Sequence, residues 1–465
     1  MITSNKKRDG RTAYFDINKI ASAMNKAFGA TTGPKDNATC LALAGEVLHL
    51  LEAEGVDIPT VEQIQDKVES VLISHGYVRT AKSYILYRAE RTRVRDMNTR
   101  LMRTFEDITY SDAKESDIKR ENANIDGNTP MGAMLKYGSE GAKHFNEMYV
   151  LNPKHSEAHR NGDIHIHDLD FYTLTTTCCQ IDILKLFKDG FSTGHGVLRE
   201  PNDISSYSAL ACIAIQSNQN DQHGGQSIVN FDYGLAPGVK KTYKKRYFRL
   251  LKNSLELLDN KLVDDDIEDL QNTLKKEGFE PALDENPEYD ARERELLIEK
   301  GFDEKEVEKV QEFTKRKAAA ETDKATYQAM EAFIHNLNTM HSRAGAQTPF
   351  SSINYGMDTS TEGRMVMKNM LLVTEAGLGH GETPIFPIQI FRVKEGINYN
   401  PGEPNYDLFK LACRVSAKRL FPNFSFQDAP FNLKYYNGKP ETEISYMGCR
   451  TRVMANVYDP TKEIS

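Results

Sequence analysis

Short apolar runs alternate with helical segments in the C-terminal part of the chain. The stretch TPIFPIQIFRVKEGIN, which begins at Thr383, reads as a strand after a Gly-rich turn, and FKLACRVSAKRLFPNF, which begins at Phe409, has helical spacing. From about residue 131 onward, similar apolar runs are separated by loops rich in Gly, Asn and His. Because strands that alternate with helices favour an α/β architecture, we expect residues 131–465 to form one.

The length and charge of the chain limit its class further. At 465 residues the chain exceeds one average domain, so two or three structural units are expected. A net charge of −8 argues against broad binding of nucleic acid or membrane surfaces. No apolar run has bilayer length, and the polar start, MITSNKKRDG, lacks the apolar region of a signal peptide. We therefore expect a cytoplasmic protein with no membrane or nucleic-acid partner.

The first 95 residues read as a small, mainly helical unit. Asp9 and Gly10 lie at the tip of an expected hairpin, and Asp16 is placed to cap the helix that follows. Backbone N–H groups at such a turn, together with Lys7 and Arg8, could close over phosphates. The same residues also suit an ordinary hairpin, so the pattern alone leaves both interpretations open.

Two other regions differ in composition from their surroundings. Residues 96–130 are polar and are expected to form a linker. Residues from about 240 to 330 contain charged helical segments around an acidic stretch, EGFEPALDENPEYDARERE. Charge runs of this kind usually belong to solvated faces, so we expect a solvated helical excursion there.

The cysteines and histidines could serve chemistry or packing. No C-x-x-C pair occurs among the six cysteines, so a structural zinc site is not expected within the chain. Disulfides are not expected either, because a cytoplasmic compartment is reducing. His165 and His167 would share one face of a strand. Cys178 and Cys179 would point to opposite faces of a strand, so that only one thiol could face a cavity. As isolated features, all four residues are better explained by packing.

The N-terminal unit resembles the ATP-cone, the regulatory module of ribonucleotide reductases and of a repressor of their genes. The resemblance rests on KKRDGR, FDINKI, TVEQIQDKVE and AKSYILYR, and it covers essentially the first 95 residues. It implies that this unit binds ATP or dATP. The family pattern assigns the nucleotide contacts to a lid, the first helix and the last helix, which here supply Lys7, Arg8, Gly10, Asp16, Lys19 and Arg88.

Eight segments from about residue 120 onward resemble the catalytic subunit of an anaerobic (class III) ribonucleotide reductase. In order they are NANIDGNTPMG, GDIHIHDLD, TTTCCQID, HGGQSIVNFD, RAGAQTPFSSINYG, HGETPIFPIQIF, FPNF and MGCR. The resemblance implies a ten-stranded α/β barrel with a loop through its centre. It also implies the reduction of ribonucleoside triphosphates to 2′-deoxyribonucleoside triphosphates by a thiyl radical. Cys449 would form this radical at the tip of the loop, and Gly448 would let the loop turn tightly and its backbone come close to another segment.

The resemblance implies roles for other residues as well. Cys178 would be the reducing thiol opposite Cys449, in preference to Cys179. His165 would line the sugar or the formate that such enzymes commonly use as reductant. The remaining expected contacts to substrate, including those to its phosphates, are from Ser351, Ser352 and His167. A dNTP at a separate specificity site, and a homodimer or higher nucleotide-dependent oligomer, are also expected.

One part of the family pattern does not occur in this chain. The family's glycyl radical lies in a loop similar to RVCGY, after a four-cysteine zinc site, and neither occurs before Ser465. We therefore expect these residues alone to be inactive, and to require a missing C-terminal part and a radical-SAM activating enzyme. Two alternatives are another glycyl-radical enzyme, such as a formate-lyase or dehydratase, which would lack the cone, and a nucleotide sensor with an inactive barrel.

Overall fold

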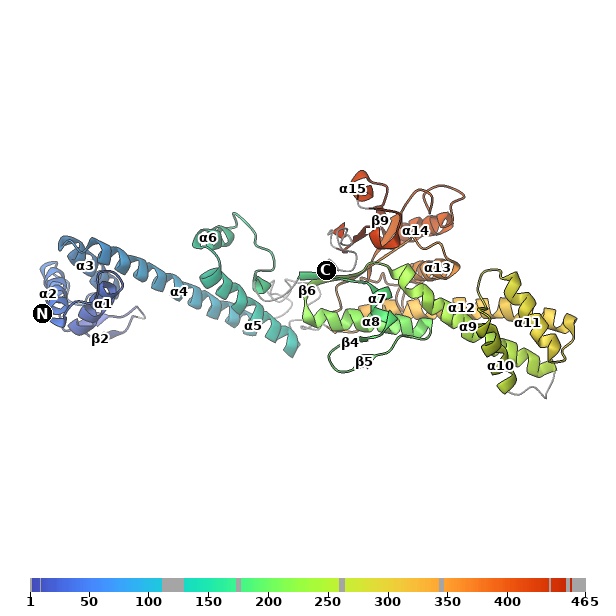
Figure 1. Cartoon of the computed structure of the whole chain (residues 1–465). Helices are drawn as coiled ribbons and strands as arrows, with labels where there is room; N and C mark the ends of the chain where they lie inside the picture. The colour runs from blue at the N-terminus through green and yellow to red at the C-terminus, as the bar shows by residue number, and fades with distance from the viewer. Residues whose placement is uncertain are drawn as a thin grey trace. The chain divides into compact units, whose positions relative to one another are not determined.

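The computed structural model describes residues 2–8, 10–110, 129–172, 177–258, 264–342, 347–434, 436–448 and 452–453. Contacts between Cα atoms divide the chain into two compact units (Figure 1). The first unit comprises Met1–Ser111 and Glu140–His167, and the second comprises Asp112–Ser139 and Asp168–Ser465. No helix in the described part of the chain combines the length and apolar composition that a membrane span needs.

The first unit begins with an antiparallel hairpin of β1 (Ser4–Lys6) and β2 (Thr12–Tyr14), which confirms the predicted turn. Four helices follow, α1 (Ile17–Gly29), α2 (Asn37–Ala53), α3 (Val61–Ser74) and α4 (Val78–Tyr110). Asp16 caps α1 as predicted, because its carboxylate accepts a hydrogen bond from the backbone N–H of Asn18 at 3.0 Å. The helices enclose an apolar core that includes Met24, Phe28 and Leu51.

Helix α4 is longer than the sequence suggested. It continues to Tyr110, so the expected linker at 96–130 is helical in its first part. No Gly or Pro interrupts residues 78–110, and such an uninterrupted segment favours a continuous helix. Residues 111–128 lie outside the described residues. The helices that follow are α5 (Pro130–Phe145), the π-helix η2 (Asn146–Val150) and α6 (Pro153–Asn161).

The second unit is built on a parallel sheet with the strand order β3-β6-β7-β8-β9. These strands are β3 (Thr177–Ile181), β6 (His223–Ile228), β7 (Ser351–Tyr355), β8 (Ile388–Val393) and β9 (Asn423–Phe426). The α/β class is confirmed, but the ten-stranded barrel is not. The other described strands of this unit form only two short antiparallel pairs, β4 (Phe191–Ser192) with β5 (Val197–Leu198), and β10 (Ser445–Tyr446) with β11 (Arg452–Val453), and they add nothing to the five-stranded sheet.

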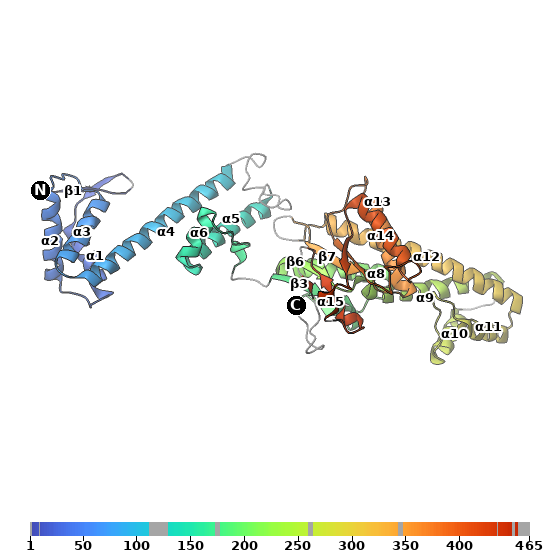
Figure 2. The same cartoon turned by 90° about the horizontal axis from the view of Figure 1, so that it is seen from above.

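The two faces of this sheet differ in polarity. Ile181, Ile228, Ile353 and Tyr355 lie in an apolar core together with residues of the surrounding helices. The longer of these helices are α8 (Ile204–Asp221), α9 (Phe231–Leu258), α12 (Glu304–Thr339), α13 (Thr361–Ala376) and α14 (Tyr406–Arg419), which are seen from two directions in Figures 1 and 2. The unit also has the short helices η3 (Leu169–Phe171), α7 (Ile183–Lys188), α15 (Pro430–Leu433) and η4 (Pro440–Thr442), of which α7 contributes Ile183 and Phe187 to this core. Polar residues occupy alternate positions, Ser227 on β6 and Ser352 and Asn354 on β7, and they contact β10 and the residue Gly448 shortly after it.

The charged region at 240–330 is helical, as predicted, but it is more than a solvated surface. Helices α10 (Asp264–Lys276) and α11 (Pro287–Glu299) lie at the far end of α9 and α12 from the sheet (Figures 1 and 2) and share an apolar core with them. Within it, the buried carboxylate of Glu293 accepts hydrogen bonds from the hydroxyls of Tyr247 and Tyr289, each at 2.7 Å, and from Gln311 Nε2 at 2.8 Å. The charged surface therefore covers a small second core.

Candidate functional site

A cationic cavity of about 940 Å³ lies in the first unit. It is lined by residues of α1, α3 and α4. Its basic residues are Lys19, Lys26, Arg88, Arg91 and Arg95. Because guanidinium and ammonium groups form charge-assisted hydrogen bonds with phosphate oxygens, this cavity suits a polyphosphate. Lys19 and Arg88 were named from the sequence, whereas Lys26, Arg91 and Arg95 were missed, although the basic residues of α4 recur at helical spacing.

The hairpin residues occupy a different place from Lys19 and Arg88. Gly10 adopts the left-handed conformation (φ 85°), and the turn closes with a hydrogen bond from its N–H to the carbonyl of Lys7 at 3.0 Å. Arg8 forms an ion pair with Glu62 and donates a hydrogen bond to Gln65 Oε1 at 2.7 Å. Gln65 lines the cavity, but Lys7, Arg8 and Gly10 do not. Arg8 therefore reaches the cavity wall only through Gln65.

The two histidines of GDIHIHDLD are exposed and belong to the first unit. The strand expected for them is not formed, because Gly162 ends α6 with a left-handed turn (φ 81°) and the chain continues through His165 and His167 without regular structure. Their ring centroids are 6.0 Å apart, and His165 lies 5.7 Å from the ring of His159. In the described residues, no group of three or more His, Cys, Asp or Glu is arranged to hold a metal ion.

The two cysteines of β3 have different surroundings. The pairing of β3 with β6 shifts register between Thr177 and Cys179, and Cys178 lies at this irregularity with a left-handed backbone (φ 60°). Such a conformation is costly for a residue with a Cβ and is concentrated at functional sites. Cys179 packs against the apolar core that contains Ile181. The geometry therefore distinguishes a core thiol, Cys179, from a thiol at a strained position, Cys178.

The hairpin of β10 and β11 flanks the segment that contains Cys449, which itself lies outside the described residues. The backbone of β10 is held by side chains of the polar sheet face. Tyr446 donates its N–H to Asn354 Oδ1 at 2.8 Å, and its carbonyl accepts hydrogen bonds from Asn354 Nδ2 at 2.9 Å and from Ser227 Oγ at 3.0 Å. Gly448 donates its N–H to Ser352 Oγ at 3.0 Å. These contacts fix the first strand of the hairpin over β6 and β7.

Gly448 is needed for this close approach. A Cβ at this position would lie 2.8 Å from Ile388 Cδ1 and 3.2 Å from the Cβ of Ser352. Such distances are too short for ordinary carbon contacts, so a larger residue would push the segment away from β7 and β8. The expectation that a glycine lets the chain come close therefore has a direct physical basis.

The serines of TPFSSINYG are used differently from the sequence expectation. Both are buried, and Ser351 donates its hydroxyl proton to the carbonyl of Pro349 at 3.2 Å. Ser352 donates its proton to the carbonyl of Gln226 at 3.1 Å and accepts from Gly448. A serine has only one proton to donate, so neither hydroxyl can donate to a phosphate while these bonds persist. The structure gives Ser352 the role of holding the hairpin.

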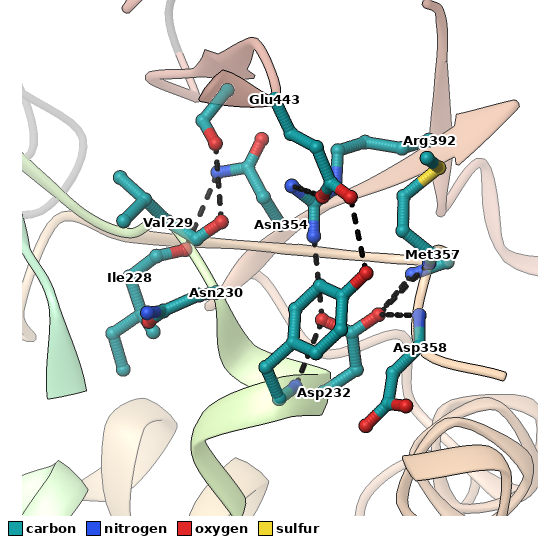
Figure 3. Close-up of polar contacts among 12 residues, drawn as sticks. Ile228, Val229, Asn230, Asp232, Asn354, Met357, Asp358, Arg392 and Glu443 are labelled. Atoms are coloured by element: carbon teal, nitrogen blue, oxygen red, sulfur yellow. Dashed lines mark hydrogen bonds and ion pairs between the residues drawn. The ribbon is translucent and has the colours of Figure 1, made fainter. Parts of the chain in front are cut away.

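A buried group of charged residues lies beneath the start of the hairpin (Figure 3). Arg392 of β8 is 1% exposed, and its guanidinium lies 2.8 Å from Glu443 and 3.3 Å from Asp232. The other oxygen of Asp232 accepts backbone N–H groups of Gly356, Met357 and Asp358 at 2.8, 2.9 and 3.1 Å. Burial raises the pKa of Glu443 to about 7, although Arg392 acts against this rise. None of these residues was singled out from the sequence.

The chain is thus an α/β protein in which a helical unit with a cationic cavity precedes a parallel sheet that holds a cysteine-containing hairpin. It belongs to the anaerobic ribonucleoside-triphosphate reductase family, whose model matches residues 121–464. A second model, the ATP cone domain, matches residues 6–93. The first match names this reductase family rather than another glycyl-radical family.

Individual relatives agree with the family match. The anaerobic ribonucleoside-triphosphate reductase of Haemophilus influenzae is 28% identical over 449 residues, which are 96% of this chain and 54% of that protein. The enzyme of the same name from Enterobacteria phage T4 is 29% identical over 342 residues, 72% of this chain and 46% of that protein. The chain spans about half the length of the curated relatives that it matches.

Two further similarities are more limited. The ribonucleoside-diphosphate reductase subunit alpha of Chlamydia pneumoniae is 39% identical over 99 residues, 19% of this chain and 9% of that protein. The crystal structure of the anaerobic ribonucleotide reductase from Thermotoga maritima in complex with dATP and CTP aligns with 72% of this chain and 50% of that chain, at 11% identity and a TM-score of 0.40. A TM-score this low does not establish a common fold.

Proposed function

We propose that this chain contains the cone and part of the catalytic site of an enzyme that reduces ribonucleoside triphosphates to 2′-deoxyribonucleoside triphosphates. A glycyl radical, generated by a radical-SAM activating enzyme, would take the hydrogen atom of the Cys449 thiol and leave a thiyl radical. That radical would abstract the 3′-hydrogen of the ribose, after which the 2′-hydroxyl leaves as water. The glycyl radical and the zinc of the family would be supplied from outside the residues described here.

The direction of the hairpin over the sheet is the observation that carries this proposal. From Tyr446 to Gly448 the chain passes from Asn354 to Ser352, and it therefore runs antiparallel to β7. Across the sheet, Ser352 is in register with Ser227, and Ser227 with Gln180. Cys178 precedes Gln180 by two residues. From Tyr446 to Gly448, just before Cys449, the chain therefore runs toward the end of the sheet at which Cys178 lies.

This geometry supports different roles for the two cysteines of β3. We infer that Cys178, at the strained position outside the apolar core, is the thiol that supplies reducing equivalents from the opposite side of the ribose. Cys179 would support it by packing. The sequence resemblance alone assigns the sugar or formate to His165 and a substrate contact to His167. The terminal reductant would be formate or a thiol protein.

The first unit would regulate this reaction. We infer that ATP and dATP bind in the cationic cavity, with Lys19 and Arg88 among the contacts and with Asp16 holding the start of α1. A ligand shifts an equilibrium only by its difference in affinity for the two states. We expect dATP to favour an inhibited assembly of a homodimer or higher oligomer and ATP an active one, with a further dNTP at a specificity site selecting the substrate.

An anaerobic turnover assay tests this function. The protein is combined with the activating enzyme, S-adenosylmethionine, formate and a polypeptide that supplies the glycyl radical, and deoxyribonucleoside triphosphates are quantified. Cys449→Ser and Cys178→Ser should each reduce the product to background, because a hydroxyl cannot replace the radical or the reducing thiol. Cys179→Ser should lose less activity, and Cys413→Ser, at an exposed position of α14, serves as the control.

Two results would contradict the proposal. Full activity of Cys178→Ser would remove Cys178 from the reaction. Robust product formation by residues 1–465 without any outside source of a glycyl radical would show that the radical arises in another way.

A further inference from the structure

The three consecutive residues that lead into the hairpin and begin it, Glu443, Ile444 and Ser445, are each held by a side-chain contact. Glu443 lies beside Arg392, Ile444 donates its N–H to Gln427 Oε1 at 3.1 Å, and Ser445 donates its hydroxyl to the carbonyl of Val229 at 3.0 Å. The fastening groups come from the ends of strands β6, β8 and β9. Most of these contacts are neutral hydrogen bonds. Glu443 differs because its contact is between two buried charged groups.

Asp232 and Arg392 connect Glu443 to the sheet in two steps. Asp232 is fully buried at the start of α9, and three consecutive backbone N–H groups after β7 hold one of its oxygens. Its other oxygen accepts a hydrogen bond from Arg392 at 3.3 Å. Arg392 in turn faces Glu443, which also accepts a hydrogen bond from the Tyr233 hydroxyl at 3.0 Å. The Glu443 side chain, two residues before β10, is therefore oriented by groups from β8 and α9.

The charges of this group do not balance. Two buried carboxyl groups, those of Asp232 and Glu443, share one guanidinium, that of Arg392, and a third buried carboxyl group, that of Asp358, has no ion pair with it. Burying unbalanced negative charge is costly, so such a site favours binding a proton. Burial and the nearby Asp232 charge also raise the pKa of Asp358 to about 6. Glu443, with the higher value of about 7, is the group that first takes up a proton as the pH falls.

We propose that Arg392 and Glu443 are positioning residues for the hairpin of β10 and β11, and that proton binding by Glu443 loosens the hairpin. Ionised Glu443 is attracted by Arg392 and holds the start of β10 against the sheet. Protonated Glu443 keeps only neutral hydrogen bonds, and Arg392 then pairs with Asp232 alone. This inference rests on the proposed function, in which the hairpin presents Cys449 to substrate.

Alkylation of the full chain by N-ethylmaleimide tests this inference without turnover. Rates at Cys449 and at the exposed Cys413 are measured by peptide mass spectrometry between pH 5.5 and 8. An ordinary thiol has a pKa of about 8.5 and burial raises the pKa of Cys413, so ionisation increases both rates by a similar factor in this range and largely cancels in their ratio. In the wild type the Cys449/Cys413 ratio should fall several-fold as the pH rises through about 7, because the ionised Glu443 restrains the hairpin. Glu443→Gln should keep the ratio high and independent of pH.

A matched control is Glu441→Gln, which removes an exposed carboxylate two residues from Glu443. This variant should retain the fall in the Cys449/Cys413 ratio near pH 7. A wild-type ratio that is flat over the whole range, or a step that persists in Glu443→Gln, would overturn the inference. The wild-type titration needs no substitution, so it decides the matter even where Glu443→Gln fails to fold. If the Cys449/Cys413 ratio falls with pH as expected but no turnover is found, the result would count against the proposed function alone.

Discussion

The two units use arginine in opposite ways. In the first unit, Arg91 and Arg95 border a cavity of about 940 Å³, where a phosphate can supply negative charge. In the second unit, Arg392 is 1% exposed and already lies beside two carboxylates of the protein. A cation that borders an open cavity can exchange water for a ligand, whereas a buried pair has already lost its water. The first arrangement is suited to ligand binding and the second to positioning.

The largest expected effect is on stability, from Arg392→Met. The substitution leaves Asp232 and Glu443 buried without their cation, and removal of one partner of a buried ion pair typically costs about 3–5 kcal/mol. The loss should be larger at pH 8 than at pH 6, because Glu443 must be ionised at the higher pH. Urea unfolding at pH 6 and at pH 8 measures this loss of stability.

The control for this prediction is Arg414→Met. Arg414 forms a hydrogen-bonded ion pair with Glu375 at 2.7 Å, but its side chain is 60% exposed. Exposed pairs contribute about 0–1 kcal/mol, so this variant should unfold almost as the wild type does. Equal losses for both variants would mean that burial does not distinguish the two kinds of arginine.

A smaller effect is expected for Gly448→Ala. The added Cβ would lie 2.8 Å from Ile388 Cδ1, and overpacking of this kind typically costs about 1–3 kcal/mol. Gly379→Ala is the matched control, because nothing lies within 4 Å of a Cβ built there and its φ is not positive. Thermal unfolding compares the two. A loss confined to Gly448→Ala would confirm that the hairpin is pressed against the sheet, and equal midpoints would contradict it.

Local features of the fold were predictable from the sequence. The hairpin and the Asp16 cap depend on residues that are close in the chain, and the α/β class follows from alternating strand and helix signals. The need for a glycine at position 448 was also evident before its neighbours were known. The number of strands was not predictable in this way. The described residues form a five-stranded parallel sheet, whereas a ten-stranded barrel was expected.

The buried charged group could not be predicted in the same way. Asp232, Arg392 and Glu443 are far apart in sequence, and each alone resembles an ordinary surface charge. One signal was present, because Arg392 interrupts the apolar run IQIFRV, and a charge inside a buried strand needs a partner. For Ser351 and Ser352 the residue type suggested a phosphate contact, but only the structure shows that their protons are already donated.

The smallest effect is expected for Arg91→Ala in the first unit. One charge-assisted hydrogen bond to phosphate contributes about 1.4 kcal/mol, so the dissociation constant for ATP should rise about tenfold. Lys82→Ala removes a positive charge from the same helix at a position that does not line the cavity. Calorimetric titration with ATP at low salt should therefore separate the two variants, and equal weakening would indicate general charge attraction.

The same pair of variants sharpens the contrast with Arg392. Arg91 is exposed, and exposed substitutions usually change the free energy of unfolding by no more than about 0.5 kcal/mol. Arg91→Ala should thus weaken ATP binding while leaving stability almost unchanged. Arg392→Met should lower stability while leaving ATP binding almost unchanged. If Arg91→Ala destabilised the protein as strongly as it weakened binding, the cavity would be part of the packing of α4 rather than a site kept for a ligand.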